Sequence, residues 1–298
     1  MNTGPQLPIV VGIDGSAPSY LAIDWAATEA GRRGAPLRLV HAIEWYPDDV
    51  VPADVPPDLA PEHVREAALA RARAGAPEAS VTVDSREGVA AAVLIEESEA
   101  ASLVVVGNRG LGGFRGLLAG SVSVQTAAHA HCPVVVVRPW VGPTAPGVEE
   151  PSDAQGSAAD RIVVGVDGSD RSDHAVGFAF QEAMLRGVGL TVVHAWRYPL
   201  STSPGELTYA VVERPDLTEL KSKRIAASIA HQRERYPAVE VRQVLAQGNP
   251  AAVLVQESFG TGLLVVGSRG HGGFTGLLLG SISDALIRHA GCPVAVVR

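Results

Sequence analysis

Short apolar runs rich in β-branched residues alternate along this chain with segments whose apolar positions recur at helical spacing. The run over residues 8–14 stops at a Gly-Ser pair, and the apolar side chains of residues 19–30 then fall on one side of a helix. Apolar runs without polar alternation are typical of parallel strands that are buried on both faces. The pattern therefore predicts strands and helices in alternation.

The alternation in the first half of the chain predicts a complete domain. The expected strands are residues 8–14, 37–43, 81–88, 103–107 and 133–138. The expected helices are one that begins at Ser16 or Ser19 and ends near Gly31 or Gly34, followed by residues 61–74, 89–100 and 121–130. Strand-helix-strand units of this kind are right-handed and build a parallel sheet with helices on both faces. We expect an α/β fold with a doubly wound, five-stranded parallel sheet flanked by helices.

The second half of the chain repeats the first. IVVGIDGS from Ile9 returns as IVVGVDGS from Ile162, an offset of 153 residues that still relates His41 to His194, and later landmarks are offset by 160. This period is too long for a solenoid unit and fits two whole domains in tandem. We expect a first domain with the start of a linker, a linker rich in Pro, Gly and acidic residues, and a second domain, at 1–146, 147–159 and 160–298.

Composition and charge exclude several classes of partner. The formal net charge is −8 and Lys and Arg form no dense cluster, so we expect no nucleic-acid surface. No apolar run reaches the roughly 18 residues of a membrane-spanning helix, and the N-terminus does not read as a secretory signal. The two cysteines are expected as core residues, and no CxxC or HExxH spacing indicates zinc. We expect a cytoplasmic protein without a membrane partner.

A glycine-rich loop follows the fourth expected strand of each half. The loops cover residues 107–121 and 267–281, whereas a strand-to-helix connection normally needs only about 2 to 6 residues. Glycine permits positive φ and removes the Cβ, so consecutive amides can turn toward an anion. Each loop ends in Gly-Ser at the start of a helix, where unpaired amides and the helix dipole favour negative charge. The sequence predicts a phosphate cradle in each half.

Two familiar phosphate-binding motifs do not match these loops. A Walker A loop needs a Lys followed by Ser or Thr, and the only lysines of the chain are Lys221 and Lys223. A dinucleotide fingerprint needs GxGxxG after the first strand, where this chain has GIDGS. Neither a usual P-loop hydrolase nor a Rossmann dehydrogenase is therefore expected.

The spacing of the two loops resembles a known signature. Each loop reads Gly-x2-Gly-x9-Gly-Ser, starting at Gly107 and at Gly267, and is similar to the ATP-binding signature of the universal stress protein family. The resemblance extends to GIDGS and GVDGS, to the His-Ala ends of the second strands and to the Cys-Pro-Val segments at the last strands. It covers almost the whole chain as a tandem pair. It implies one adenine-nucleotide site in each half, which binds ATP with or without Mg²⁺.

The resemblance also assigns residues to these sites. The adenosine is expected against an Asp, a Gly that allows close approach and an Ala that offers main-chain groups: Asp14, Gly12 and Ala42 in the first half, and Asp167, Gly165 and Ala195 in the second. The ribose and phosphates are expected against the loops and helix starts: Gly107, Asn108, Arg109, Gly110, Leu111, Gly112, Gly113, Gly120, Ser121, Val122 and Ser123, and Gly267, Ser268, Arg269, Gly270, His271, Gly272, Gly273, Gly280, Ser281, Ile282 and Ser283. Ser123 and Ser283 would add hydroxyls. No catalytic residue and no metal ligand is assigned.

Other interpretations of the same residues stay open. The loops can be plain surface connections, and Asp14 and Asp167 can be turn residues, because Asp-Gly-Ser is good turn chemistry. His41 and His194 are expected as buried core histidines rather than catalysts. The residues between the shared glycines differ, with Arg115 opposite Thr275 and Leu111 opposite His271, so the sequence does not predict equal affinity of the two sites.

The resemblance implies a nucleotide-dependent regulator of stress or dormancy responses that acts on an unidentified protein partner. The alternative is a slow ATPase or phosphotransferase in which Asp14 or Asp167 positions a metal or water, although no Lys accompanies the phosphates. A third hypothesis is an interaction module that has lost its ligand. The apolar strands at 133–138 and 293–298 would be hazardous as free sheet edges. The resemblance implies that they pair across the domains as an intramolecular pseudo-dimer, and that two chains form a homodimer.

Overall fold

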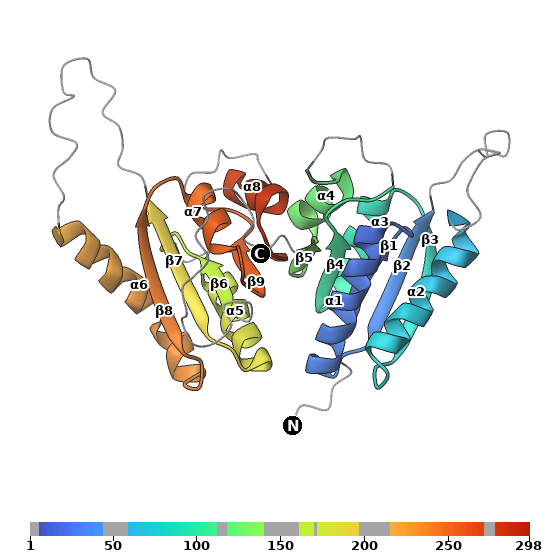
Figure 1. Cartoon of the computed structure of the whole chain (residues 1–298), viewed down its shortest axis with the longest axis horizontal. Helices are drawn as coiled ribbons and strands as arrows, with labels where there is room; N and C mark the ends of the chain where they lie inside the picture. Colours follow the sequence, from blue (N-terminus) through green and yellow to red (C-terminus); the bar gives the residue numbers. More distant parts are fainter. Residues whose placement is uncertain are drawn as a thin grey trace, which may run out of the picture.

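The computed structural model describes residues 6–43, 59–111, 118–139, 161–169, 172–196, 215–270 and 278–298. Within these ranges the chain forms a single ten-stranded sheet with helices on both faces (Figure 1). The α/β fold class expected from the sequence is confirmed. The expected linker at 147–159 lies outside the described residues, so the domain boundaries stay predictions.

The first half follows the expected order of elements, which are β1 (Ile9–Ile13), α1 (Ala17–Arg33), β2 (Leu37–Ile43), α2 (Pro61–Gly75), β3 (Val81–Glu87), α3 (Ala90–Glu97), η2 (Ser98–Ala100), β4 (Leu103–Gly107), α4 (Ser121–His129) and β5 (Val134–Val137). Helix α1 begins after Ser16, whose side chain accepts a hydrogen bond from the Ser19 amide, and ends at Gly34 with φ 64°. Both caps are among those expected. The expected third helix differs in that its last turn is a 3₁₀ helix.

The second half repeats this order in β6 (Ile162–Gly165), α5 (Ser172–Arg186), β7 (Leu190–Trp196), α6 (Pro215–Arg235), β8 (Val241–Gln247), α7 (Pro250–Glu257), β9 (Leu263–Gly267), α8 (Ser281–His289) and β10 (Val294–Val297). Its one large departure is α6, which has 21 residues where α2 has 15. Helix α6 lies between His194 and Gly248, where the offset between the two copies grows from 153 to 160 residues.

The sheet joins the two halves through their last strands. The strand order is β3-β2-β1-β4-β5-β10-β9-β6-β7-β8, and strands are parallel within each half. At the junction β5 and β10 pair antiparallel, with Val136 opposite Val294 and Val134 opposite Val296. All residues of both strands are buried. The pairing expected from the family resemblance is therefore present, and it removes two apolar sheet edges. Association of two chains stays a prediction.

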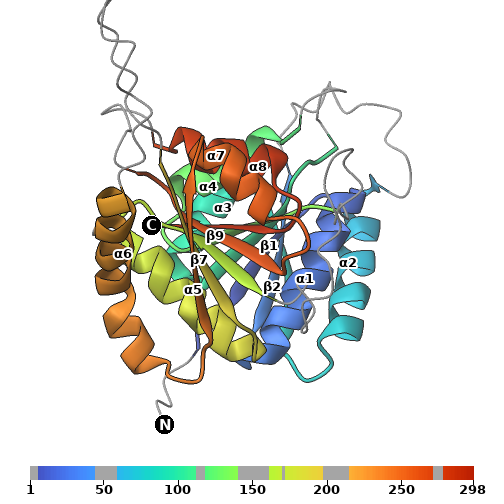
Figure 2. The ribbon, with the colours of Figure 1, turned by 60° about the vertical axis from the view of Figure 1, so that its left-hand side comes forward.

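Two apolar layers cover the sheet and run across both halves. Helices α1, α2, α5 and α6 pack on one face, and α3, α4, α7 and α8 pack on the other, as Figure 2 shows. Because successive strand residues point to opposite faces, each buried strand contributes to both layers. Among the described residues, Phe180 has the largest fully buried side chain.

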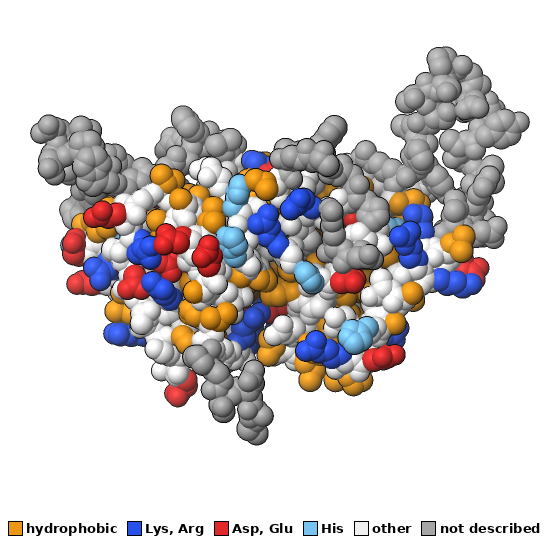
Figure 3. Space-filling view, turned by 180° about the vertical axis from the view of Figure 1, so that it is seen from behind, with side chains coloured by type: hydrophobic (Ala, Val, Ile, Leu, Met, Phe, Trp, Pro, Cys, Tyr) orange, Lys and Arg blue, Asp and Glu red, His pale blue; other side chains and the backbone are white. Residues whose placement is uncertain are grey.

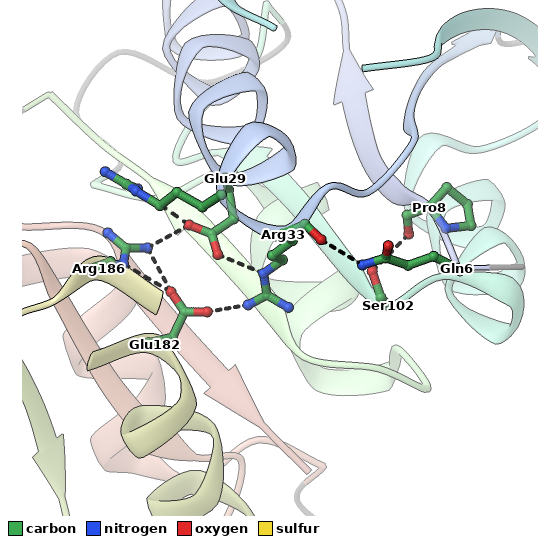
Figure 4. A network of polar contacts seen from close by, with 8 residues as sticks. Gln6, Pro8, Glu29, Arg33, Ser102, Glu182 and Arg186 are labelled. Carbon is green, nitrogen blue, oxygen red and sulfur yellow. Dashed lines mark hydrogen bonds and ion pairs between the residues drawn. The ribbon is translucent and has the colours of Figure 1, made fainter. Parts of the chain in front are cut away.

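Four charged residues join α1 to α5 beneath the junction (Figure 4). They are Glu29, Arg33, Glu182 and Arg186, which we call the interhelix quartet. Arg186 Nη2 lies 2.9 Å from Glu29 Oε2 and 2.7 Å from Glu182 Oε2. Arg33 Nε lies 2.6 Å from Glu29 Oε1, and its Nη2 contacts Glu182. Each guanidinium thus binds one carboxylate of each half.

The interhelix quartet is buried but electrically balanced. Both Glu side chains are 0% exposed and the two Arg side chains are 9–10% exposed. The guanidiniums also cover aromatic rings of the opposite half, since Arg33 lies 5.6 Å from the Phe178 ring centroid and Arg186 lies 5.3 Å from that of Trp25. Buried charges are tolerated only when they are paired and hydrogen-bonded, as these are. Trp25 and Phe178 thus lie beside a guanidinium of the opposite half.

Candidate functional site

The strand order places one candidate site in each half. In the first half β1 lies between β2 and β4, and α1 and α4 leave β1 and β4 toward opposite faces of the sheet. The carboxyl ends of β1 and β4 therefore flank a topological switch point, where open α/β sheets bind their ligands. The ends of β6 and β9 are the equivalent place in the second half. The GIDGS and GVDGS turns and the glycine loops all begin at these strand ends.

Asp14 ties the turn after β1 to the glycine loop. Its Oδ1 accepts a hydrogen bond from the Ser16 amide at 2.9 Å, and its Oδ2 accepts one from the Leu111 amide at 3.0 Å. In the second half, Asp167 Oδ1 accepts from the Ser169 amide at 2.9 Å and from the Ser172 hydroxyl at 2.7 Å. Both aspartates therefore organise a turn at the switch point, and Asp14 also fixes the start of the loop.

Two of the expected glycines are explained by packing. A Cβ at Gly12 would lie 2.8 Å from Leu94 Cδ1, and one at Gly165 would lie 2.8 Å from Leu254 Cδ1. The leucines of α3 and α7 thus pack directly against the first strand of their half, and a side chain at either glycine would have to displace a leucine methyl group. Leucine packing is one reason for these glycines, and the close approach of a ligand, which the family resemblance implies, stays a prediction.

The helix starts after the loops are partly closed by the protein itself. The amide of Gly120 donates to the carbonyl of Asn108 at 2.8 Å, and the amide of Gly280 donates to that of Ser268 at 2.8 Å. No side chain caps α4 or α8. The amides of the first helical turns, from Ser121 and from Ser281 onward, are therefore the ones that remain for an anion. The expected donation from Gly120 and Gly280 themselves does not fit this geometry.

The serines one turn inside these helices also bond within the protein. The Ser123 hydroxyl donates to the Gly120 carbonyl at 2.9 Å, and the Ser283 hydroxyl donates to the Gly267 carbonyl at 2.7 Å. These bonds tie each helix to the strand or loop before it. The hydroxyl protons expected to reach a ligand are thereby occupied, and a ligand contact of either serine stays a prediction.

A pocket of about 290 Å³ lies at the switch point of the second half. It brings together ten residues that the sequence assigned to the site, namely Gly165, Asp167, Ala195, Gly267, Arg269, Gly270, Gly280, Ser281, Ile282 and Ser283. Its apolar wall includes Pro250 and Leu254 of α7, which the sequence did not single out. The signal that could have found them is the position of α7 directly after the third strand of the half. The volume is near the lower limit of about 300 Å³ for small-molecule sites.

Several assigned residues lie beside this pocket or outside the described ranges. Ser268 is buried and does not line the pocket, and Asn108 is its buried counterpart in the first half. Leu111 is 54% exposed at the mouth of the first loop. The remaining loop positions, Gly112, Gly113, His271, Gly272 and Gly273, lie outside the described residues.

The two histidines face away from the pocket. His41 and His194 alternate with Ala42 and Ala195 along their strands, so they point to the opposite face of the sheet. Burial lowers the pKa of both imidazoles from the usual 6.5, which favours the neutral form. His194 Nδ1 lies 2.9 Å from the carbonyl of Val166 and must donate, because a carbonyl only accepts. Their expected role as core residues agrees with this burial.

Charged side chains are few in the described pocket lining and of both signs on the face in Figure 3. Among these residues no group of three or more His, Cys, Asp or Glu could hold a metal ion. The charged residues of the described pocket lining are Asp167 and Arg269. On the face in Figure 3, side chains of both signs are interspersed. No helix in the described part of the chain is long and apolar enough to cross a membrane.

These features define a tandem, doubly wound α/β protein with a glycine loop and a helix N-terminus at each switch point. A family model described as the universal stress protein family matches residues 7–138 and 158–298. The chain is 37% identical to universal stress protein Rv2623 of Mycobacterium tuberculosis over 98% of its own length and 97% of that protein. The chain therefore belongs to the universal stress protein family.

Solved structures resemble the chain at lower identity. A universal stress protein from Archaeoglobus fulgidus superposes with a TM-score of 0.65, at 18% identity and 98% coverage of both chains, and it shows the shared fold. A universal stress protein in complex with cAMP is 28% identical, covers 45% of this chain and 98% of its own, and has a TM-score of 0.36.

Proposed function

We propose that each half of the chain binds one ATP and that the protein acts as a nucleotide-dependent regulator of stress or dormancy responses. The observation that carries the proposal is the pocket of the second half, which lies between the Asp167 turn and the uncapped start of α8. A polar turn at one end and a helix N-terminus at the other suit an elongated ligand with an anionic tail.

The residues fit ATP part by part. The turn at Asp167 and the strand end at Ala195 would hold the adenosine, and the apolar side chain of Leu254 would pack on it. The amides at the start of α8 would hold the phosphates, with Arg269 near them. In the first half Asp14 and the start of α4 occupy the equivalent places. The bound nucleotide supplies the signal that a protein partner reads.

Binding without turnover is the function that these residues favour. Phosphoryl transfer needs a positioned nucleophile and compensation of the phosphate charge. Asp167 Oδ1 is already bonded to the Ser169 amide and to the Ser172 hydroxyl. A slow ATPase that uses the same sites is the competing hypothesis, and it is distinguished by the fate of the bound nucleotide.

The experiment measures bound nucleotide and its stoichiometry. Heat-denatured protein is analysed for released adenine nucleotide, and the purified chain is titrated with ATP, for which we expect two equivalents per chain. ATP at about 100 times its dissociation constant should add roughly 2.7 kcal/mol to the stability of the folded state. The proposal fails if no adenine nucleotide is released, no ATP is taken up and the melting temperature does not change.

Matched glycine variants place the sites. Gly120→Glu and Gly280→Glu each put a carboxylate where phosphate is expected, and each should reduce the stoichiometry from two to one. Gly31→Glu is the control, because nothing lies within 4 Å of a Cβ at this helical position. Retention of two equivalents in Gly120→Glu contradicts the placement. Radiolabelled ATP should remain intact in the complex for hours, and turnover that Asp14→Ala abolishes would support the ATPase instead.

A further inference from the structure

One residue in each half joins the last strand to the start of the helix that follows the glycine loop, which we call the loop helix (α4 or α8). The Asn108 amide donates to the Val137 carbonyl at 2.7 Å, and the Asn108 carbonyl accepts from the Gly120 amide at 2.8 Å. Asn108 therefore fixes the start of α4 relative to the end of β5. In the second half Ser268 makes the same two bonds, to Val297 at 2.7 Å and to Gly280 at 2.8 Å.

The residue after each last strand reaches into the opposite half. Arg138 Nη1 donates to the carbonyl of Ile287, in the last turn of α8, at 3.4 Å. Arg298 Nη1 donates to the carbonyl of Ala130, the residue that ends α4, at 3.1 Å. The last carbonyls of a helix have no intrahelical partner and carry the negative end of the helix dipole, so a guanidinium stabilises them. Each loop helix is thus held at its far end by an arginine of the other half.

These contacts form a closed circuit between the two candidate sites. From the start of α4 the circuit runs through Asn108 to Arg138 and the end of α8. From the start of α8 it returns through Ser268 to Arg298 and the end of α4. Figure 1 shows α4 and α8 on either side of the junction where the last strands meet. The start of each helix lies at one site, and its end contacts the arginine that follows the last strand of the other site.

Charge links this circuit to the anion sites. Burial lowers the pKa of Arg138, the nearby Cys292 thiol partly raises it again, and the positive charge of Arg109 at the first glycine loop lowers it. Burial and the charge of Arg269 likewise lower the pKa of Arg298. Arg138 Nε is buried and has no hydrogen-bond partner among the described residues. An anion at either loop would offset the repulsion between the two neighbouring arginines.

We propose that the two nucleotide sites are coupled, so that a nucleotide in one half increases the affinity of the other, with Arg138 and Arg298 as the positioning residues. This inference rests on the proposed function. A phosphate at the first loop offsets the charge beside Arg138, which then binds the end of α8 more tightly and orders the helix whose start forms the second site. Arg298 makes the equivalent contact at the end of α4, and because coupled binding equilibria are reciprocal, both arginines contribute to one coupling free energy.

The experiment measures the ATP affinity of the second site with the first site filled or blocked. Gly120→Leu blocks the first site without adding charge, and the backbone there is extended (φ −81°, ψ 155°), which suits any residue. Calorimetric titration of the otherwise native chain should give two equivalents, and of Gly120→Leu one equivalent with at least about fivefold weaker affinity for the second site. In an Arg138→Gln, Arg298→Gln background, Gly120→Leu should leave the second-site affinity unchanged.

The control and the outcomes separate this inference from the proposed function. Arg288 is part of α8 itself and pairs with Asp284 on the surface of that helix. Arg288→Gln is the control and should keep the full coupling. Two equivalents of ATP whose affinities do not depend on each other would overturn the coupling and leave the proposed function standing. Coupling that persists in the Arg138→Gln, Arg298→Gln double variant would overturn the assigned route. Absence of any ATP uptake would overturn both proposals.

Discussion

The two halves share a backbone framework and differ in what packs behind the Asp-Gly-Ser turn. In the first half α2 places Val64 there, and a Cβ added at Gly15 would lie 2.9 Å from Val64 Cγ2. In the second half α6 places Arg224 there, and its Nη2 donates to the Gly168 carbonyl at 3.2 Å. The same turn is therefore backed by an apolar side chain in one half and by a cation in the other.

The ends of the second strands extend this difference. Strand β2 ends at Ile43, whereas β7 ends at Trp196. The Trp196 ring stacks on His194, and its centroid lies 5.0 Å from Lys221 Nζ. Positive charge on a protein increases the local concentration of an anionic ligand, and it does so at longer range here, because these cations lie beside the turn assigned to the adenosine rather than beside the phosphates. The comparison teaches that the main chain which would hold a nucleotide is duplicated, whereas the nearby cations of the described residues differ: Lys221 and Arg224 in the second half, and Arg65 alone in the first. We therefore expect the second site to bind ATP more tightly.

The largest expected effect comes from the interhelix quartet, to which each half contributes one Glu and one Arg. Substitutions in it test whether the two halves contribute equally to the shared framework. Glu182→Ala and Glu29→Ala each leave two guanidiniums of the interhelix quartet with one carboxylate. Each variant should lose about 3–5 kcal/mol of unfolding free energy, because an uncompensated buried charge remains. Urea denaturation measures the loss, and Glu240→Ala is the control because its side chain is 81% exposed.

The two quartet variants also sharpen the comparison. Glu29 has an additional partner in Arg32, at 3.4 Å, whose side chain is 36% exposed. An exposed pair contributes only about 0–1 kcal/mol, so the two losses should agree within that range. A loss below about 1 kcal/mol in either variant would show that the quartet does not hold the halves together.

A smaller effect is expected from the cations of α6. In the Gly120→Glu background only the second site remains, and adding Lys221→Met with Arg224→Met should weaken ATP binding about 2- to 5-fold, the effect of losing partly exposed charges. The affinity should then approach that of the first site, measured in Gly280→Glu. Titration calorimetry at two salt concentrations checks this, because the difference between the sites should shrink as salt screens the charges.

Lys223→Met is the matched control for these cations. Lys223 is 72% exposed, lies on the same helix and pairs with Glu219 rather than with Trp196. It should leave second-site affinity unchanged. Equal affinities of the two sites in the native chain would contradict the comparison directly.

The sequence predicted the framework well because buried parallel strands carry a strong local signal. Strands β2 and β4 have the bounds that the apolar runs indicated, and α1 has two of the expected caps. The candidate site followed from the ends of these strands, since parallel strands place their carboxyl ends along one edge. These features depend on residues close together in the chain.

The features that the sequence did not predict depend on contacts between distant segments. Glu29 and Glu182 look like surface residues of a helix until α1 meets α5, and the available signal was the Glu-x3-Arg spacing at the same place in both copies. The sequence predicted that the Gly120 amide could bind an anion, but in the structure this amide donates a hydrogen bond to the Asn108 carbonyl. Spacing alone does not show which amides a loop pairs internally.

Acid should destabilise both halves through their buried histidines. Burial lowers the pKa of His41 and of His194 from 6.5, so the unfolded chain binds the proton first as pH falls. The stabilising contribution is complete above about pH 6.5 and is lost as pH falls toward the folded-state values. His41 faces Asp14 and Arg65, and His194 faces Asp167, Lys221 and Arg224. Urea midpoints at pH 7.5 and 5.5 measure the loss.

Each histidine should account for its own share of this pH dependence. His41→Gln and His194→Gln should each reduce the difference between the two midpoints, and the exposed His231→Gln should not. If the difference survives in the His41→Gln, His194→Gln double variant, the acid sensitivity comes from other groups. Loss of the whole difference in one single variant would show that only that half is sensitive to acid.

The smallest effect concerns the two cysteines, where the pKa and the accessibility of the thiols favour opposite orders of reaction. Burial raises the pKa of Cys132 to about 12 and that of Cys292 to about 11, so the thiolate fraction favours Cys292 about tenfold. Cys292, however, is 0% exposed, whereas Cys132 is partly exposed. A thiol that the reagent cannot reach reacts only after the protein opens locally. Opening of a packed core costs several kcal/mol, far more than the roughly 1.4 kcal/mol that one pKa unit represents.

Cys132 should therefore react first with a disulfide reagent at pH 8, as followed in Cys132→Ser and Cys292→Ser. Faster reaction of Cys292 would mean that the junction beside β10 opens readily in the native protein.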